Sequence, residues 1–600
     1  MFKDHPKGLF VAFFSNMGER FGFYTMMAIL VLFLQAKYGL TEAQAGVYYS
    51  WFYFGIYSLA LIGGIIADAT RKYKLVILLG IVIMFGGYLV MAMPGNPLAI
   101  TLVGLFTIAF GNGLFKGNMQ AVVGQMYDNP KYSKVRDTAF MIFYMGINIG
   151  AFFAPFVANG IRNWFLKSQG FIHDASLPAM CHAYSNGTLE DVSQFQELAN
   201  HVSGKTVADL NAFATGYIDV FAKGYNYAFG IAAGAMVLSL LVYIIFNKFL
   251  PTAGKVVKTE NKDGAKTNLS GFLLAAGLMV TTSVIFYFLM NDAAMGAAVG
   301  LFVGFVAMML QISTKEERPR VSSLILVFFV VIFFWMSFHQ NGLTMTFFAR
   351  DYTVKEVAPF TNIFFNLSSL LTFIGTIAGV FLLFNKKISN KLIGIAMSLV
   401  FGGLTWYFVT GFESSNPIAP EVFQSFNPLF IVALTFPVMG AFTWLRGKNM
   451  EPSTPRKIGI GMIIAAIGFL VILIGSIGLV SPHELLFVEN GVTRYNPVPD
   501  SSRIVPYWLI SSYLVLTIAE LFLSPMGLSF VSKVAPPRFQ GLMQGGWLLA
   551  TAVGNKFLFI GSDFWGKLDL WQLWAIFVVC CLLSAVFIFS IMKRLEKATK

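Results

Sequence analysis

Long runs of apolar residues, separated by short polar segments, recur along the whole chain. A helix needs about 20 mostly apolar residues to cross a bilayer. Runs of that length, broken at charged or Pro/Gly turns, predict sixteen membrane-spanning helices at residues 9–35, 45–68, 75–94, 98–127, 137–166, 225–249, 269–290, 293–312, 322–349, 360–385, 391–411, 425–445, 457–480, 505–532, 539–561 and 571–592. The pattern therefore predicts an all-α polytopic membrane protein.

The polar segments between these runs alternate in charge. Every second segment, starting before the first run, carries Lys and Arg, whereas the segments between them contain few basic residues. Lys and Arg are enriched in the cytoplasmic loops of membrane proteins. An error of one helix would invert this alternation downstream, so its persistence predicts an even number of helices and places both termini in the cytoplasm.

Two polar segments are longer than the others. Residues 167–222 contain six acidic and two basic residues, which favours an external cap or an ordered loop. Residues 251–268 form a charged, Gly-bearing segment that we interpret as an internal linker between two structural halves.

Composition agrees with a membrane protein. Of the 600 residues, 56% are hydrophobic and 12% charged, and the mean hydropathy is +0.69, whereas soluble domains are about 25% charged. The net charge of +13 would suit a nucleic-acid-binding protein, but the basic residues lie in short loops between apolar runs and are better explained by membrane orientation. The first apolar run is too long for a cleaved signal peptide.

Motifs of enzymes and metal sites are absent from the sequence. Cys181, Cys580 and Cys581 have no metal-ligand spacing, so neither a metal site nor a disulfide framework is expected. The sequence contains no P-loop, HExxH or GxSxG motif. We therefore expect no enzyme activity, no cofactor and no nucleic-acid partner. The alternative hypothesis from a different functional class is a membrane enzyme or a structural subunit of a larger complex.

Six ionisable residues lie inside the apolar runs, where charge is costly and usually marks function. They are Glu19, Arg20, Lys116, His339, Glu520 and Lys556. Two bases and an acid in the first half and an acid in the second would form a cavity with two opposite poles. Such a cavity suits a zwitterion, with its carboxylate near Arg20 and Lys116 and its ammonium near Glu520.

Structural explanations compete with these assignments. Glu19 and Arg20 could neutralise each other, but a pair in mid-helix is an expensive way to hold a fold together. Lys116 lies too deep to extend easily to the membrane surface. For Lys556, which lies nearer a helix end, and for His339, a structural role has equal weight.

Seven motifs in these stretches resemble, in order, those of the proton-dependent oligopeptide transporter (POT) family of the major facilitator superfamily. Residues 16–24 read NMGERFGFY, close to the family's ExxERFxYY, and residues 143–150 read FYMGINIG, which fits FYxxINxG. The others are GGIIADATRK at 63–72, FKGN at 115–118, QSFNPLFI at 424–431, ELFLSP at 520–525 and GGW at 545–547. One such motif is weak, but the ordered series is specific.

The resemblance implies a major facilitator fold of two six-helix bundles, with substrate bound between them near mid-membrane. It maps residues 1–250 to the N-terminal bundle, 251–321 to the linker and an extra helix pair, 322–592 to the C-terminal bundle and 593–600 to a cytoplasmic tail. The pair at 269–312 is similar to one that bacterial members carry, whereas the pair at 360–411 and the 167–222 segment match nothing in the family pattern. The short 481–504 connection favours a bacterial source and hence the inner membrane.

The family's functional residues carry over where the motifs match. The resemblance implies a peptide-carboxylate site at Arg20 and Lys116 and an amino-end site at Asn148, Asn427 and Glu520. It implies pocket and gate residues at Tyr24, Tyr57, Trp335, Ser524 and Trp547. It also implies proton coupling by Glu19, Lys116 and His339, and a conformational loop motif at Asp68 and Arg71.

Three positions depart from the family. Asn16 replaces the first glutamate of ExxER, Met27 replaces a frequent arginine, and His339 replaces an acidic residue.

The resemblance therefore implies import of di- and tripeptides by proton symport through alternating access. The partners are short peptides, protons and the lipid bilayer, and a monomer is the expected functional unit. The alternative is a related permease for another small solute, such as nitrate, an amino-acid conjugate or a peptide-like drug, with altered or absent proton coupling.

Overall fold

The computed structural model describes residues 5–127, 131–132, 136–251, 269–385, 387–489, 492–536 and 539–599. It is built almost entirely of helices: α1 Lys7–Tyr38, α2 Glu42–Thr70, α3 Tyr73–Ala92, α4 Leu98–Met126, α5 Arg136–Ser168, α6 Leu177–Ser185, α7 Val192–Ser203, α8 Leu210–Phe246, α9 Leu269–Met290, α10 Ala293–Ile312, α11 Arg318–Phe338, α12 Thr344–Asp351, α13 Pro359–Asn362, α14 Leu367–Leu383, α15 Ile388–Gly411, α16 Phe426–Gly447, α17 Thr454–Gly475, α18 Tyr507–Val534, α19 Gln540–Lys556, α20 Phe559–Trp565, α21 Leu570–Ser590 and α22 Met592–Thr599. The predicted linker 251–268 lies outside the described residues except for Pro251.

In the described residues, four short strands form two antiparallel pairs. Strand β1 Glu356–Val357 pairs with β2 Asn416–Pro417, and β3 Leu486–Glu489 pairs with β4 Val492–Tyr495. The first pair joins the chain segments that flank α14 and α15. The second forms a hairpin in the 481–504 connection.

Fourteen helices in the described part of the chain are long and apolar enough to cross a membrane. Two of the sixteen predicted spans are shorter than expected. The run at 360–385 forms a helix only over Leu367–Leu383, because α13 and the turn after it take up its first residues. The run at 539–561 is divided between α19 and α20, since the chain turns after Lys556.

The predicted helix at 322–349 is also interrupted. Helix α11 ends at Phe338, a 3-10 turn covers His339–Gly342, and α12 continues from Thr344. The polar sequence HQNG supplies this break, with the Gln340 side chain donating to the carbonyl oxygen of Leu558 at 3.0 Å. Such a 3-10 segment within a helix often marks a hinge.

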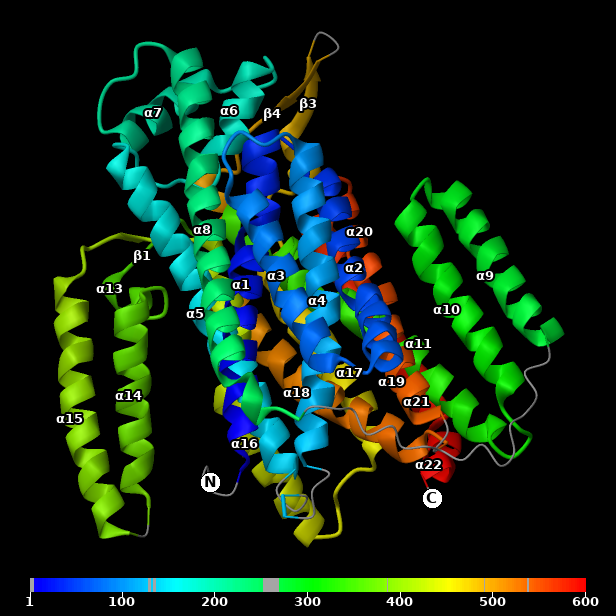
Figure 1. Cartoon of the computed structure of the whole chain (residues 1–600). Helices are drawn as coiled ribbons and strands as arrows, with labels where there is room; N and C mark the ends of the chain where they lie inside the picture. The colour runs from blue at the N-terminus through cyan, green and yellow to red at the C-terminus, as the bar shows by residue number, and fades with distance from the viewer. Residues whose placement is uncertain are drawn as a thin grey trace.

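The helices form an elongated bundle with distinct ends (Figure 1). The N- and C-termini lie at one end, here named the terminal end. Helices α6 and α7 and the β3–β4 hairpin lie at the other, here named the cap end. Both termini at one end agree with the predicted even number of crossings.

The segment that covers the cap end has narrower bounds than the sequence indicated. Helix α5 continues to Ser168 and α8 begins at Leu210, so residues 169–209 form the connection between them. Asp191 and Asp209 begin α7 and α8 by accepting hydrogen bonds from first-turn backbone N–H groups. We name residues 169–209 the cap.

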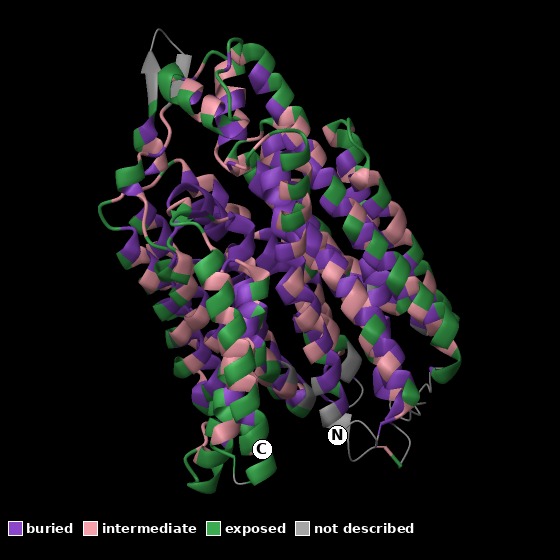
Figure 2. Ribbon diagram, turned by 90° about the vertical axis from the view of Figure 1, so that its left-hand side faces the viewer, coloured by how far each residue is buried: buried purple, intermediate pink, exposed green. Residues whose placement is uncertain are grey.

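Helix α1 runs through the centre of the N-terminal bundle and packs against α5 and α8. A side chain at Gly150 of α5 would collide with the α1 backbone at Met17 and Phe21, so this glycine permits the close approach of the two helices. Buried residues gather in the middle of the bundle, and exposed ones cover its outside (Figure 2). This packing holds Glu19 and Arg20 of α1 inside the protein.

Two helix pairs stand beside the bundle on opposite sides in the view of Figure 1: α9 with α10, and α14 with α15. In α15, Gly394 is the only described residue that is buried. Large apolar side chains such as Phe381, Phe384 and Leu399 are exposed along the second pair. In a bilayer these side chains face lipid, which accounts for their apolar character.

Candidate functional site

A buried polar cluster lies in the middle of α1. The Glu19 side chain is fully buried, and its Oε2 atom lies 2.7 Å from Nε of the neighbouring Arg20. Its other oxygen, Oε1, accepts a hydrogen bond of 2.6 Å from Nδ2 of Asn112 in α4. Sequence reasoning missed Asn112, although its place one helical turn before Lys116 put it on the same face of α4.

Lys116 of α4 lies over an aromatic ring. Its Nζ atom lies 4.0 Å from the centre of the Tyr57 ring, a cation–π geometry. Within the described part of the chain, no carboxylate oxygen lies within 4.0 Å of Nζ. Lys116 and Glu19, which the resemblance assigns together to proton coupling, therefore form no ion pair in this conformation.

A second polar cluster joins α16 and α18 in the C-terminal half. Nδ2 of Asn427 donates to Oε2 of Glu520 and to Oγ1 of Thr517, each at 3.0 Å. Glu520 is 8% exposed. Thr517, which sequence reasoning also missed, precedes Glu520 by three residues and so lies on the same face of α18.

Tyrosines of the N-terminal half lie within electrostatic range of both clusters. Tyr24 and Tyr57 interact electrostatically with both Arg20 and Glu520. Tyr144 also interacts with Glu520, and its backbone carbonyl accepts a hydrogen bond of 3.1 Å from Asn148. A basic group of α1 and an acidic group of α18 therefore act on one polar region between the halves, the arrangement expected for a zwitterion.

His339 lies at the break between α11 and α12. Its Nδ1 atom is 2.5 Å from Oδ1 of Asn555. Its ring stacks on Trp335, with ring centres 4.5 Å apart, and lies 4.8 Å from the Tyr53 ring. These contacts are those of a packed, hydrogen-bonded histidine, while the positive charge of Lys116 also acts on the ring.

Trp547 of α19 and Ser524 of α18 belong to the C-terminal half. The Trp547 ring packs edge-on against Phe328, 6.4 Å between centres, and occupies space that a side chain at Gly527 would need. The Ser524 hydroxyl is buried and has no hydrogen-bond partner among the described residues.

The loop motif after α2 is described in part. Arg71 ends the helix in a left-handed conformation with φ of 57°, and its N–H donates to the Ala67 carbonyl at 2.8 Å. Its side chain is exposed. The Asp68 side chain lies outside the described part of the structure.

Ion pairs close the cap end between segments before and after the linker. Arg162 of α5 forms a fully buried pair with Glu421, which also accepts a hydrogen bond of 3.1 Å from the Tyr225 hydroxyl. Arg350 lies 2.9 Å from Glu42. Sequence reasoning predicted none of these pairs, because their members stand near helix ends, where charge is common.

The cap contributes one more ion pair. Nζ of Lys355 lies 2.6 Å from Oδ2 of Asp174. Burial of Asp174 opposes ionisation, but the charge of Lys355 and hydrogen bonds from Lys355 and Ser176 outweigh it and lower the pKa of Asp174 to about 2. The cap is thus tied to the C-terminal half by a charge pair that persists over the physiological pH range.

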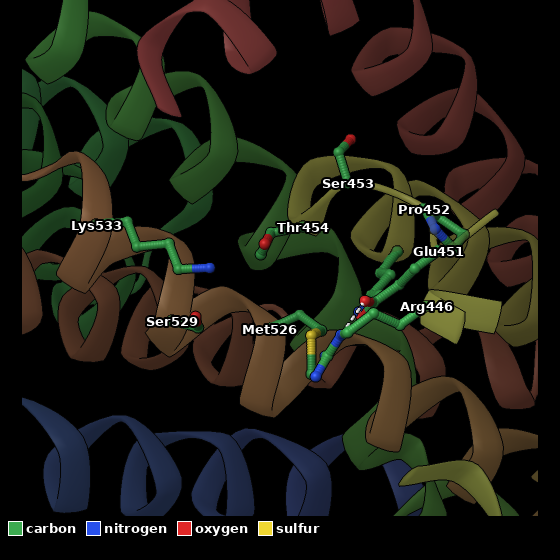
Figure 3. Close-up of a pocket in the computed structure, with 9 residues that line it drawn as sticks. Arg446, Glu451, Pro452, Ser453, Thr454, Met526, Ser529 and Lys533 are labelled. Carbon is green, nitrogen blue, oxygen red and sulfur yellow. Dashed lines mark hydrogen bonds and ion pairs between the residues drawn. The ribbon is translucent and has the colours of Figure 1, made fainter. Parts of the chain in front are cut away.

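A cavity of about 510 Å³ lies elsewhere, among α16, α17 and α18 of the C-terminal half (Figure 3). Its lining residues are Arg446, Glu451, Pro452, Ser453, Thr454, Lys457, Met526, Ser529 and Lys533. Hydrogen bonds from Arg446 and Lys457 hold the pKa of Glu451 at about 2. No predicted site residue lines this cavity, and its three bases fit the cation-rich loops of one membrane face.

Sequence comparison matches the chain to one protein family. The model described as the POT family matches residues 74–392 and 410–564. The peptide transporter YePEPT of Yersinia enterocolitica is 27% identical over 564 residues, covering 92% of this chain and 87% of that protein. Dipeptide and tripeptide permease A of Erwinia pyrifoliae is 24% identical over 555 residues, covering 91% and 83%.

Solved structures are similar along their whole length. A peptide transporter POT, a glutamate-to-glutamine mutant in complex with alafosfalin, has a TM-score of 0.65 and 24% identity, covering 100% of this chain and 97% of that one. A POT family transporter in complex with 5-aminolevulinic acid has a TM-score of 0.65 and 21% identity, covering 100% and 98%.

Proposed function

Because the chain belongs to the POT family, we propose that it imports di- and tripeptides by proton symport through alternating access. Its likeness to solved POT transporters confirms the predicted all-α polytopic class and the major facilitator fold. It is a multi-pass inner-membrane transporter. We further propose that both termini are cytoplasmic, that the cap faces outward and that the monomer transports.

The observation that carries the substrate proposal is the arrangement of opposite charges across one polar region. Arg20 of α1 and Glu520 of α18 both act electrostatically on Tyr24 and Tyr57. Nη2 of Arg20 is buried and has no hydrogen-bond partner among the described residues. A peptide carboxylate would satisfy this donor, with Lys116 as the second cation.

The amino end of the peptide would bind at the opposite pole. Glu520 and the Asn427 amide that orients it supply a carboxylate and a carbonyl oxygen to an ammonium group. Asn148 of α5 supplies another amide. Tyr24, Tyr57, Trp335, Ser524 and Trp547 would surround the side chains.

Glu19 would carry the transported proton. As a carboxylate it is stabilised by Arg20 and Asn112, and protonation removes the charge that holds Arg20. Arg20 would then be released to the peptide carboxylate, which links proton binding to substrate binding. Lys116, now over Tyr57, would return to Glu19 after peptide release, and His339 would respond to the charge on Lys116.

Alternating access requires the cap end to open. The pairs Arg162–Glu421, Arg350–Glu42 and Lys355–Asp174 each join segments before and after the linker, so they must separate when it does. We propose that Asp68 and Arg71 act in the same change at the terminal end. The break at His339–Gly342 would act as a hinge in this conformational change.

Uptake of a radiolabelled dipeptide into proteoliposomes tests this function. With an inward proton gradient, uptake should be saturable and inhibited by excess unlabelled di- and tripeptides. Free amino acids at the same concentration should not inhibit it. Uptake that is insensitive to the gradient would contradict proton coupling. Absence of peptide-inhibited uptake would contradict the proposed substrate class.

A related solute with an amino and a carboxylate end is the second candidate. A similar POT transporter was solved with 5-aminolevulinic acid, and Asn16, Met27 and His339 depart from the peptide-transporter pattern. The Glu520–Asn427 pair favours an amine over nitrate. The inhibition of labelled dipeptide uptake by 5-aminolevulinic acid is compared with the inhibition by an unlabelled dipeptide. The stronger inhibitor indicates the preferred class of substrate.

A further inference from the structure

Asn112 contacts the charged cluster without carrying charge itself. Its Nδ2 atom donates to Oε1 of Glu19 at 2.6 Å, and neither side chain is exposed to solvent. On the other side, Arg20 lies 2.7 Å from Oε2. One amide and one guanidinium thus hold the carboxyl group of Glu19 in this conformation.

The position of Lys116 makes this contact informative. Lys116 follows Asn112 by one turn of α4, so both side chains project from the same face of the helix. Lys116 nevertheless lies over the Tyr57 ring. Asn112 therefore orients Glu19 while Lys116 lies over Tyr57.

The unused half of the amide points to a further property. Oδ1 of Asn112 is buried and has no hydrogen-bond partner in the described part of the chain. An amide contains both a donor and an acceptor, whereas a lysine ammonium contains donors only. Turning the amide would let Oδ1 accept the O–H of a protonated Glu19, in place of Nδ2 donating to its carboxylate.

We infer that Asn112 is a positioning residue of proton coupling, which keeps the Glu19 carboxyl group in place in both protonation states. The inference rests on the proposed proton symport through Glu19. Asn112 keeps Glu19 in reach when protonation weakens its attraction to Arg20 and Lys116. Those cations are then free to move without loss of the proton site.

Other titratable groups act on the same carboxyl group. They are Arg20 and Tyr24 of α1, Lys116 of α4 and Tyr88 of α3. All of them remain in a protein changed only at Asn112. A change in the pH dependence of uptake can therefore be assigned to the loss of the Asn112 amide.

The test measures gradient-driven dipeptide uptake against pH, and exchange of labelled for unlabelled dipeptide at equal pH on both sides, for Asn112→Leu. Asn112→Leu removes a hydrogen bond from both forms of Glu19, but the bond to the charged carboxylate is the stronger one. The variant therefore favours the neutral acid, and we expect the uptake profile to move to higher pH by about one unit. The KM for exchange should stay within about twofold, since the peptide-binding residues are intact. Asn112→Ala, a smaller change, should show the same displacement if the leucine protein does not insert.

Two controls separate this role from a structural one. Asn226 is a buried amide of the same half that donates to the Met91 carbonyl at 2.7 Å and contacts no described carboxylate, so Asn226→Leu should leave the pH profile in place. In a Glu19→Gln background, which lacks the proton site, dipeptide exchange should have the same pH dependence with and without Asn112→Leu.

An unmoved profile for the Asn112 variants, in a preparation whose parent shows proton-dependent uptake, would overturn the inference and leave the proposed function intact. Equal displacement in the Asn226 control would also overturn it. A parent protein without proton-dependent peptide uptake would instead overturn the proposed function.

Discussion

Nζ of Lys556 lies 2.6 Å from Oδ2 of Asp292, so a buried lysine of α19 receives its counter-charge from the turn between α9 and α10. The same carboxylate accepts hydrogen bonds from the Trp51 indole of α2 at 3.0 and 3.2 Å. Helices α2 and α19 come from different halves of the transporter and are in contact. One carboxylate of the extra helix pair therefore binds both halves, which gives that pair a role beyond filling space.

Asp292→Asn should destabilise the protein and impair transport. The Lys556 side chain is fully buried, and removal of one partner from a buried ion pair costs about 3–5 kcal/mol. Thermal unfolding in detergent, followed by the loss of monodisperse protein, measures the effect. Asp563→Asn, which breaks an exposed pair with Lys567, is the matched control, and Lys556→Gln added to Asp292→Asn should restore part of the stability. Equal unfolding temperatures for the two single variants would contradict the role of Asp292.

Glu520→Gln should weaken dipeptide binding about tenfold to a hundredfold while the protein still reaches the membrane. A hydrogen bond to a charged group contributes about 1.5–3 kcal/mol, and the amide replaces the carboxylate that would face the peptide ammonium. Competition of unlabelled against labelled dipeptide measures the affinity. Glu316→Gln, at an exposed position, controls for the chemical change. Near-normal competition in Glu520→Gln would exclude Glu520 as the ammonium site.

Lys355→Gln should change the rate of transport but not its pH profile. The Asp174 carboxyl group has a pKa of about 2, below the usual range, so its pairing with Lys355 is complete above about pH 4 and is lost only as the pH falls toward 2. The pair therefore does not titrate where uptake is measured. Uptake between pH 5 and pH 8, by Lys355→Gln and the parent, should give curves of the same shape and different height. A displaced curve would show that the cap takes part in proton coupling.

Removal of the α14–α15 pair should leave part of the transport activity. The pair stands beside the bundle (Figure 1), and β1 pairs with β2 where the chain leaves and re-enters it. A short Gly/Ser linker in place of residues 360–411 preserves the topology of the helices that follow. Dipeptide uptake, normalised to inserted protein, measures the result. Complete loss of uptake in a stably inserted protein would make the pair an essential part of the transporter.

Sequence reasoning identified the groups whose chemistry is unusual inside a membrane and, through the ordered motifs, the family and its fold. The resemblance implied that Asn427 and Glu520, 93 residues apart, belong to one amino-end site. The structure joins their side chains at 3.0 Å, and the role of that site stays a prediction. Sequence reasoning missed Asn112 because asparagine in an apolar helix is not costly enough to stand out. It missed the partner of Lys556 because which residues meet across helices depends on helix rotation and on the docking of α10, and the pattern along one helix contains neither.

The contacts of His339 yield the last prediction. Its Nδ1 atom bonds to Asn555 in α19, its ring stacks on Trp335 in α11 and lies beside Tyr53 in α2, and Lys116 in α4 is the charged group that acts on it. Because protonated His339 and Lys116 repel each other, the charge on one depends on the charge on the other. His339→Gln retains a side-chain donor that can reach Asn555 and removes the titration, so we expect it to displace or flatten the profile of uptake against pH at fixed membrane potential.

His339→Gln also loses the stacking contact with Trp335. Trp335→Leu controls for that loss, because it removes the same stack and keeps the imidazole. Superimposable profiles for His339→Gln and the parent would assign His339 a packing role only.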